Sequence, residues 1–251
     1  MPADADSRFV WGVNPVLEAL RARAGEVERI YVTDGQVTSR SANELFSRAK
    51  DAGIRVQKLP RERLAAMAEG GVHQGVVAEL RTFAYADLEE ILKAAKASAR
   101  PALVVVLDGI EDPHNLGAII RSAHALGAHG VVLAKDRAAG VTGVVAKASA
   151  GAIEHCPIAR VVNISRALED LKKEGLWVAG ATVDGDQWLP KARLDGPLAV
   201  VIGAEGAGIR EGVLKHCDFK LKIPMQGKVQ SLNASVSAGI VLYEVIRQRQ
   251  A

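Results

Sequence analysis

The second half of the sequence contains three polar segments whose residue types are suited to chemistry. The first, DGIEDPHNLGAIIRSAHALGA, offers the amide of Asn115 and the guanidinium group of Arg121. The second, IGAEGAGI, places Glu205 among glycines, and the third contains Ser231 and Asn233. Groups of these kinds can orient a polar substrate and stabilise charge that develops during a reaction. Each segment alone also has an ordinary structural explanation.

Asn115 and Arg121 belong to a predicted helix in which Asn115 is the N-cap and Leu116 the first helical residue. The helical period places Arg121 about 140° around the helix from Leu116, away from the apolar stripe. Arg121 is therefore either a solvated side chain or a group that binds phosphate or another polar ligand.

Glu205 argues against a dinucleotide site in the second segment. The fingerprint G-x-G-x-x-G starting at Gly203 would need glycine at position 205. A carboxylate there repels a pyrophosphate, whereas a ligand with a sulfonium and an amino group tolerates it. The glycines either let the backbone approach a flat ligand or form a tight strand-to-helix turn, and both explanations stay open.

The third segment runs from Ile223 through Ser231, Leu232 and Asn233 into the last helix. Small side chains open that helix: Ala234, Ser235, Ser237, Ala238 and Gly239. They permit close approach to a ligand or simple packing on a sheet. Four lysines surround the segment: Lys215, Lys220, Lys222 and Lys228. These lysines suit either a solvated surface or phosphate contacts.

The elements that must position these segments follow from the apolar pattern. Continuous apolar runs after Pro101 predict strands that are buried on both faces, hence a parallel sheet covered by helices on either side. The runs are Ala102–Leu107, Val131–Ala134, Trp177–Thr182, Leu198–Ile202 and Phe219–Ile223. Ligands bind beyond the carboxyl ends of such strands, where all three segments begin.

The chain is predicted to contain two α/β domains. Residues 1–80 alternate predicted helices and strands in a small module, and residues 81–100 are polar and Ala/Lys-rich, as in a linker with a partly helical stretch at Leu88–Ala97. Residues 101–251 form the larger domain with the parallel sheet. A length of 251 residues is enough for two cores.

Composition and charge narrow the class of protein. The sequence is 49% hydrophobic and 24% charged, with an acidic start and no apolar run of membrane-spanning length, so we expect a cytoplasmic protein without membrane contact. Cys156 and Cys217 fit no disulfide framework or zinc pattern and are expected as reduced thiols in or near the core. The net charge of +3 permits a polyanionic partner.

Together, the motifs N-x-G-x-x-x-R at Asn115–Arg121, I-G-x-E-x-x-G at Ile202–Gly208 and I-P-M…S-L-N-x-S at Ile223–Ser235 resemble the SpoU/TrmH branch of the SPOUT methyltransferases. The N-terminal stretch, from FVWGVNPVLEALRA to HQGVVAEL, resembles the small substrate-binding domain of the bacterial 23S rRNA (guanosine-2'-O-)-methyltransferase subfamily. The resemblance covers almost the whole chain.

The resemblance implies a SPOUT domain with a deep trefoil knot, an N-terminal α/β domain like ribosomal protein L30e, and a homodimer. It implies methyl transfer from S-adenosylmethionine to a ribose 2'-hydroxyl of RNA, without a metal and with no DNA partner. The subfamily points to a guanosine in the peptidyl-transferase loop of 23S rRNA. Cofactor binding maps onto Gly203, Ile223 and Leu232, and catalysis onto Arg121, Asn115, Glu205, Ser231 and Asn233.

In the family, the arginine that matches Arg121 activates the 2'-hydroxyl. A guanidinium is essentially never deprotonated in proteins, so Arg121 is either an unusual base or a group that orients phosphate and stabilises the alkoxide. Alternative substrates are another rRNA or a tRNA ribose. Three other classes of protein are alternatives: a nucleotide-dependent oxidoreductase, a non-catalytic RNA-binding ribosome-assembly protein, and a metal hydrolase. The last is disfavoured because His114, His124 and His155 lack paired ligand spacing.

Overall fold

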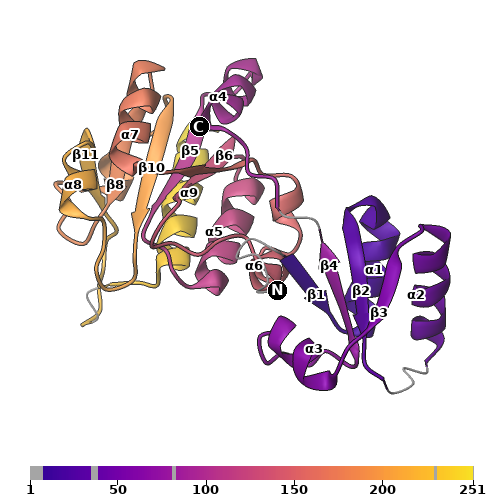
Figure 1. Cartoon of the computed structure of the whole chain (residues 1–251). Coiled ribbons are helices and arrows are strands. Elements are labelled where there is room, and N and C mark those ends of the chain that lie inside the picture. The colour runs from indigo at the N-terminus through magenta and orange to yellow at the C-terminus, as the bar shows by residue number, and fades with distance from the viewer. Residues whose placement is uncertain (1–7, 35–38, 81–82, 229–230, 251) are drawn as a thin grey trace. The chain divides into compact units, whose positions relative to one another are not determined.

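The computed structural model describes residues 8–34, 39–80, 83–228 and 231–250 (Figure 1). The acidic start of the chain, on which the absence of a targeting segment was predicted, lies outside these ranges. The chain divides into two compact units, one made mainly of residues up to Ala84 and one made mainly of residues from Tyr85 on. Each unit has a hydrophobic core of its own.

The N-terminal unit contains a four-stranded mixed sheet in the order β1-β4-β2-β3. Its strands are β1 (Arg8–Trp11), β2 (Val27–Val32), β3 (Arg55–Lys58) and β4 (Val76–Leu80). Its helices are α1 (Val13–Arg23), η1 (Ala24–Glu26), α2 (Arg40–Asp51) and α3 (Arg61–Met67). β2 and β3 pair in parallel, whereas β4 pairs with β1 and with β2 in the antiparallel direction.

The core of this unit lies between the sheet and α1 and α2. Leu17 from α1, Leu45 from α2 and Ile30 from β2 are buried together there. The Ser39 side chain begins α2 by accepting a hydrogen bond of 3.0 Å from the Ala42 amide, as expected of an N-cap serine. A smaller cluster around Leu64 packs α3 against the other face of the sheet.

The second unit contains a seven-stranded sheet in the order β7-β6-β5-β10-β8-β11-β9, and all its pairings are parallel. Its strands are β5 (Leu103–Asp108), β6 (Gly130–Ala134), β7 (Ile158–Val161), β8 (Trp177–Ala181), β9 (Gln187–Trp188), β10 (Leu198–Gly203) and β11 (Phe219–Lys222). The predicted parallel sheet is confirmed, together with the five strands expected from the apolar runs.

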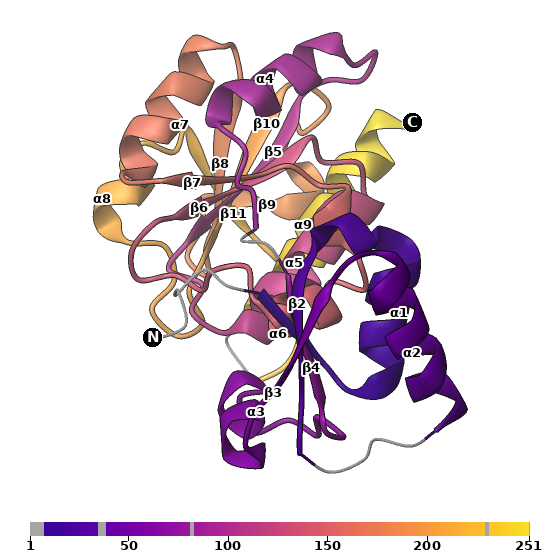
Figure 2. The same cartoon turned by 45° about the vertical axis from the view of Figure 1, so that its right-hand side comes forward.

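Helices cover both faces of this sheet (Figures 1 and 2). Those on one side are α4 (Leu88–Ala97), α7 (Ile164–Lys173) and the short α8 (Glu211–Leu214). Those on the other are α5 (Pro113–Ala125) and α9 (Ala234–Arg249), with α6 (Gly143–Ala148), η2 (Ala152–Glu154) and η3 (Leu189–Lys191) completing the unit. Successive residues of β5 and β10 point to alternate faces, and because helices cover both faces, all of them except the half-buried Gly203 are buried.

Two edge strands of the seven-stranded sheet, and β1 at an edge of the first sheet, were not predicted from the sequence. Ile158–Val161 forms β7 at one edge, and its second half is only half-buried, so it lacks the continuous apolar run of a central strand. Gln187–Trp188 forms β9 at the other edge and contains only two residues. The segment interpreted as a linker contains α4, whose Ile91 and Leu92 are buried in the core of the second unit.

Within the described ranges, the helices include none that combines the length and the apolar character needed to cross a membrane. The trefoil knot implied by the family resemblance stays a prediction.

Candidate active site

The three polar segments leave the carboxyl ends of β5, β10 and β11. Because β5 and β10 are neighbours and only β8 separates β10 from β11, parallel pairing brings these exits to one edge of the sheet. The edge of an open parallel sheet is where ligands bind in such folds. The sequence therefore predicted both the segments and their meeting place.

The loop after β10 is a closed turn. The Ala204 amide donates to the Gly208 carbonyl oxygen at 3.1 Å, and the Gly208 amide donates back to the Ala204 carbonyl oxygen at 2.9 Å. A Cβ at Gly203 would lie 2.1 Å from the Gly208 carbonyl carbon, so the turn requires glycine at that position. Gly206 and Gly208 have φ of +81° and +67°, which favour glycine as well. The turn explanation of these glycines is thus confirmed.

An ion pair between a buried carboxylate and a half-exposed arginine fixes the far end of this loop. The Asp108 side chain is fully buried at the end of β5, and its Oδ2 accepts a hydrogen bond of 2.8 Å from the Arg210 amide. Its Oδ1 accepts from Arg210 Nε at 2.7 Å and also from the Arg210 Nη2. The hydrogen bonds to Asp108 raise the pKa of Arg210, which stays charged. Sequence reasoning missed this pair, although a carboxylate directly after a buried strand was a visible signal.

One residue of each polar segment enters a single hydrogen-bonded cluster. Asn115 Nδ2 and Asn233 Nδ2 both donate to Glu205 Oε2, each at 3.3 Å. Asn233 Nδ2 also donates to Asn115 Oδ1 at 2.9 Å. The structure therefore brings together three of the residues that the resemblance marks as functional, across sequence separations of up to 118 residues.

The position of Asn115 differs from the prediction that it caps α5. The helix begins at Pro113, and Asp112 is its N-cap, with Oδ1 accepting from the His114 amide at 3.0 Å. Proline suits the first helical position because its missing N–H is not needed there. Asn115 lies in the first turn with 8% of its surface exposed, and its side chain is free to join the cluster.

Asn233 has two roles at the start of α9. Its Oδ1 accepts hydrogen bonds from the Ser235 amide at 2.9 Å and the Ser235 hydroxyl at 2.6 Å, and so caps the helix. Its Nδ2 meanwhile points to Asn115 and Glu205. The helix start and the cluster therefore depend on the same amide.

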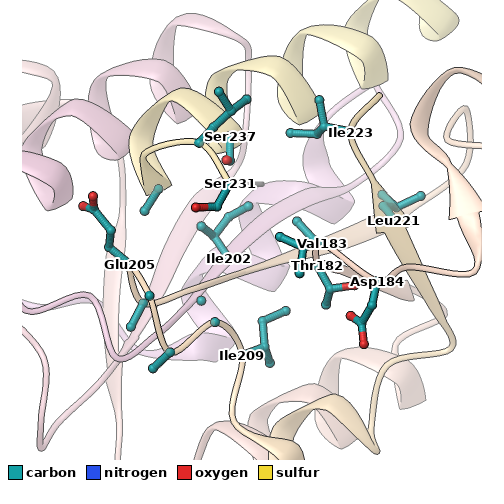
Figure 3. Close-up of a pocket in the computed structure, with 18 of the residues that line it drawn as sticks. Thr182, Val183, Asp184, Ile202, Glu205, Ile209, Leu221, Ile223, Ser231 and Ser237 are labelled. Atoms are coloured by element: carbon teal, nitrogen blue, oxygen red, sulfur yellow. The ribbon is translucent and has the colours of Figure 1, made fainter. Parts of the chain in front are cut away.

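A pocket of about 490 Å³ lies beside this cluster (Figure 3). The predicted residues that line it are Gly203, Glu205, Ile223, Ser231 and Leu232. The exit of β8, which the sequence analysis did not consider, also contributes Thr182, Val183 and Asp184. Much of the remaining wall is apolar, with Ile202, Ile209 and Leu221 among the contributors. A concave, largely apolar site with a few polar groups is typical of a small-molecule site, and its volume lies in the usual range.

Arg121 is placed on the exposed surface of α5 and does not line the pocket. In the part of the chain that the structure describes, its guanidinium makes no hydrogen bond or ion pair, so it is available to an external anion. Of the four lysines near the third segment, Lys215 pairs with Glu211 at 2.9 Å and Lys222 lies 4.4 Å from the ring centroid of Trp188.

Two of the histidines contact each other. His124 and His155 stack, with ring centroids 5.6 Å apart. Among the residues that the structure describes, no group of three or more His, Cys, Asp and Glu side chains is arranged to hold a metal ion. Cys156 and Cys217 are free thiols, and burial raises their pKa to about 12 and about 11, respectively.

The protein has an α/β fold with a seven-stranded parallel sheet. Loops from one edge of this sheet surround a pocket and an amide–carboxylate cluster, as in an α/β protein that binds a ligand. The model of the SpoU rRNA methylase family matches residues 102–243, and the model described as RNA 2'-O ribose methyltransferase substrate binding matches residues 9–86. The chain belongs to the SpoU rRNA methylase family. It is thus a methyltransferase of that family, which excludes the oxidoreductase alternative.

Two relatives match the chain along nearly its full length. A TrmH family tRNA/rRNA methyltransferase of Bacillus subtilis, YacO, is 45% identical over 96% of this chain and 96% of its own length. The 23S rRNA (guanosine-2'-O-)-methyltransferase RlmB of Coxiella burnetii is 41% identical over 97% of both chains. Among solved structures, the SpoU methyltransferase AviRb from Streptomyces viridochromogenes, in complex with AdoMet, has a TM-score of 0.76 at 28% identity, covering 98% of this chain and 92% of that chain.

Proposed function

We propose that this protein transfers a methyl group from S-adenosylmethionine to a ribose 2'-oxygen of RNA, with a guanosine of the peptidyl-transferase loop of 23S rRNA as its target. The observation that carries the proposal is the cluster of Asn115, Glu205 and Asn233 beside the pocket. The family membership, the AdoMet complex of AviRb and the substrate of RlmB support it.

The pocket fits this cofactor. Its volume of about 490 Å³ and its apolar wall suit an adenosine with a short aliphatic extension. At Gly203 the pocket wall is bare backbone, because a Cβ there would overlap the Gly208 backbone. The Glu205 carboxylate disfavours a pyrophosphate but suits a cationic ligand. We assign cofactor binding to Gly203, Ile223 and Leu232, with Ser231 completing the wall.

When bound, the cofactor supplies an electrophilic methyl group on a sulfonium. The protein must hold the attacking ribose oxygen close to that carbon and in line with it, because orientation supplies much of such a rate enhancement. Asn115 and Asn233 orient Glu205 through its Oε2, and the closed turn and the Asp108–Arg210 pair hold the backbone that carries Glu205.

Arg121 is assigned to the RNA rather than to the cofactor. Its guanidinium is exposed, so it can bind a substrate phosphate and stabilise the negative charge that develops on the 2'-oxygen. A role as general base would require an environment that removes a proton, and we therefore favour charge stabilisation.

Replacing Arg121 with alanine tests this assignment. We expect Arg121→Ala to leave cofactor affinity, measured by calorimetry, within about two-fold, and to lower labelled-methyl incorporation into 23S rRNA by roughly 100-fold or more. Arg166→Ala is the matched control, because Arg166 is also an exposed arginine on a helix, α7. A fully active Arg121→Ala protein would remove the arginine from the mechanism.

The N-terminal unit supplies RNA selection in this proposal. Residues 1–80 form the RNA substrate-binding domain and residues 101–251 the methyltransferase domain, in a protein that works in the cytoplasm. Residues 81–100 connect the two, and α4 within them packs on the methyltransferase domain. The match of residues 9–86 to a substrate-binding family supports this division. Methylation of a tRNA or another rRNA ribose is the alternative, since YacO is described as a tRNA/rRNA methyltransferase.

We further infer that the protein is a homodimer through α9. Its exposed apolar residues Val236, Ile240 and Tyr243, with 49%, 36% and 61% of their surface accessible, follow the helical period and form one stripe. The stripe begins three residues after Asn233, so a second copy seated on it would lie beside the site. Exposed apolar stripes of this kind mark protein–protein contacts.

A further inference from the structure

The pocket has two carboxylates, and they lie at opposite ends (Figure 3). Glu205 is engaged by the amides of Asn115 and Asn233. Asp184, which follows β8, makes no hydrogen bond or ion pair with any residue that the structure describes. A carboxylate that lines a pocket and has free oxygens can accept hydrogen bonds from the donors of a bound ligand.

The turn after β8 holds Asp184 in a fixed place. The next residue, Gly185, is buried, and a Cβ there would lie 2.6 Å from the Leu221 carbonyl carbon and 2.8 Å from the Lys222 amide nitrogen. Asp186 Oδ1 accepts a hydrogen bond of 2.9 Å from the Lys220 amide. Both residues after Asp184 are thus fastened to β11, and the backbone that carries the carboxylate is preorganised.

Apolar side chains form much of the wall between the two carboxylates. Ile202 and Ile209 come from β10 and its loop, and Leu221 and Ile223 come from β11 and its exit. These side chains suit the flat ring of a purine, and the other polar side chains of the lining are the hydroxyls of Thr182, Ser231 and Ser237. The two vicinal hydroxyls of a ribose are donors that the two oxygens of one carboxylate can accept together, as acidic residues do in other nucleoside sites.

We propose that Asp184 binds the ribose diol of the cofactor and thereby selects a ribonucleoside ligand. The inference rests on the proposed function. The Glu205 end of the pocket adjoins Asn115 and the first polar segment, where the transfer takes place, so the nucleoside extends toward β8. Asp184 accepts hydrogen bonds from the 2'- and 3'-hydroxyls there, while Glu205 stays with its amides.

Ligand displacement with two probes tests the inference. S-adenosylhomocysteine contains adenine, ribose and the amino acid, whereas 5'-methylthioadenosine lacks the amino acid. Competition against labelled S-adenosylmethionine gives both affinities even when one is weak. We expect Asp184→Asn to weaken both ligands equally, by about ten-fold or more, the loss typical of a charge-assisted hydrogen bond. Asp195→Asn, which changes an exposed carboxylate outside the pocket lining, should leave both affinities unchanged.

Two outcomes would overturn the inference. If Asp184→Asn weakens S-adenosylhomocysteine but not 5'-methylthioadenosine, the carboxylate binds the amino group rather than the ribose. If neither affinity changes by more than about two-fold, Asp184 does not contact the cofactor. Failure of the unaltered protein to bind S-adenosylmethionine would instead remove the proposed function itself, so the two failures are distinct.

Discussion

Asn233 shows how one side chain serves both the fold and the site. Its Oδ1 caps α9, and its Nδ2 reaches Asn115 and Glu205. The sequence suggested that Asn233 leads into the last helix, and the resemblance marked it as functional. Its hydrogen bonds to Asn115 and Glu205, which lie 118 and 28 positions away in the sequence, could not be predicted, because they depend on the order of the strands in the sheet.

Replacing Asn233 with serine separates these two roles. Serine caps helices about as well as asparagine, so we expect the free energy of unfolding of Asn233→Ser to stay within about 0.5 kcal/mol of the unaltered protein. The amide donors are lost, and methyl transfer should fall by about ten-fold or more. Urea unfolding and labelled-methyl incorporation measure the two effects.

Asn163 provides the matched control for this substitution. It caps α7 by accepting a hydrogen bond of 3.1 Å from the Arg166 amide and lies outside the pocket lining. Asn163→Ser should therefore leave methyl transfer unchanged. Equal activity losses in the two variants would show that capping alone explains the effect at Asn233.

Cys156 makes stability sensitive to alkaline pH. Burial raises its pKa from 9.0 to about 12, so the folded state holds the thiol proton more tightly than the unfolded state does. The resulting stabilisation is complete below about pH 9 and is lost as pH rises toward 12. At about pH 10 the loss is roughly 1 kcal/mol.

The Cys156→Ala variant tests this origin. The decrease in the free energy of unfolding between about pH 8 and pH 10 should be smaller in the variant by roughly 1 kcal/mol, as measured by urea unfolding. An identical decrease in both proteins would show that other groups cause the alkaline sensitivity.

The loop between β10 and α8 is held in place by hydrogen bonds at both of its ends. Backbone hydrogen bonds close it at Ala204 and Gly208, and Arg210 anchors its end to Asp108 on β5. The glycines of the loop were read correctly as compatible with a tight turn. The anchor was missed because pairing between residues 102 positions apart follows from the adjacency of β5 and β10, which local pattern does not contain.

Removing the anchor should affect both stability and ligand binding. Arg210→Ala leaves the buried Asp108 carboxylate with only its backbone donor, and we expect a loss of about 2 kcal/mol in the free energy of unfolding. The loop that carries Glu205 loses its fixed end, so cofactor affinity should fall as well.

Arg193→Ala is the comparison for Arg210→Ala. Arg193 forms an exposed bridge to Asp195, and such surface pairs contribute at most about 1 kcal/mol. Its removal should leave cofactor affinity unchanged. Equal effects of the two substitutions, in urea unfolding and calorimetry, would contradict the anchoring role of Arg210.

At the scale of the whole molecule, the sequence predicted the class of fold well and the organisation at its edges less well. Central strands such as β5 and β10 are continuous apolar runs, which are hard to misread. The edge strands β7 and β9 are short and partly exposed, so their pattern does not differ from that of a loop. Helix α4 packs into the core of the second unit through one face. Because the rest of the segment is polar, its composition indicated a linker.

The proposed dimer predicts a change in mass when the stripe on α9 is altered. Tyr243→Asp places a charge on the stripe, and an unpaired charge is costly to bury in an interface. We expect the variant to be monomeric in sedimentation experiments at micromolar concentration, with its unfolding transition retained. Val162→Asp is the control and should remain dimeric. Val162 is also apolar, has 80% of its surface exposed, and lies outside α9. A dimeric Tyr243→Asp protein would place the interface elsewhere.

We propose that the chain methylates a ribose 2'-oxygen of 23S rRNA. Mass-spectrometric mapping of rRNA methyl groups, after incubation of unmodified 23S rRNA with the protein and S-adenosylmethionine, tests this activity. We expect one new 2'-O-methylguanosine in the peptidyl-transferase loop, absent when Arg121→Ala replaces the unaltered protein. Methylation on a base, or no new methyl group in 23S rRNA or its assembling particle, would show that the proposed function is wrong.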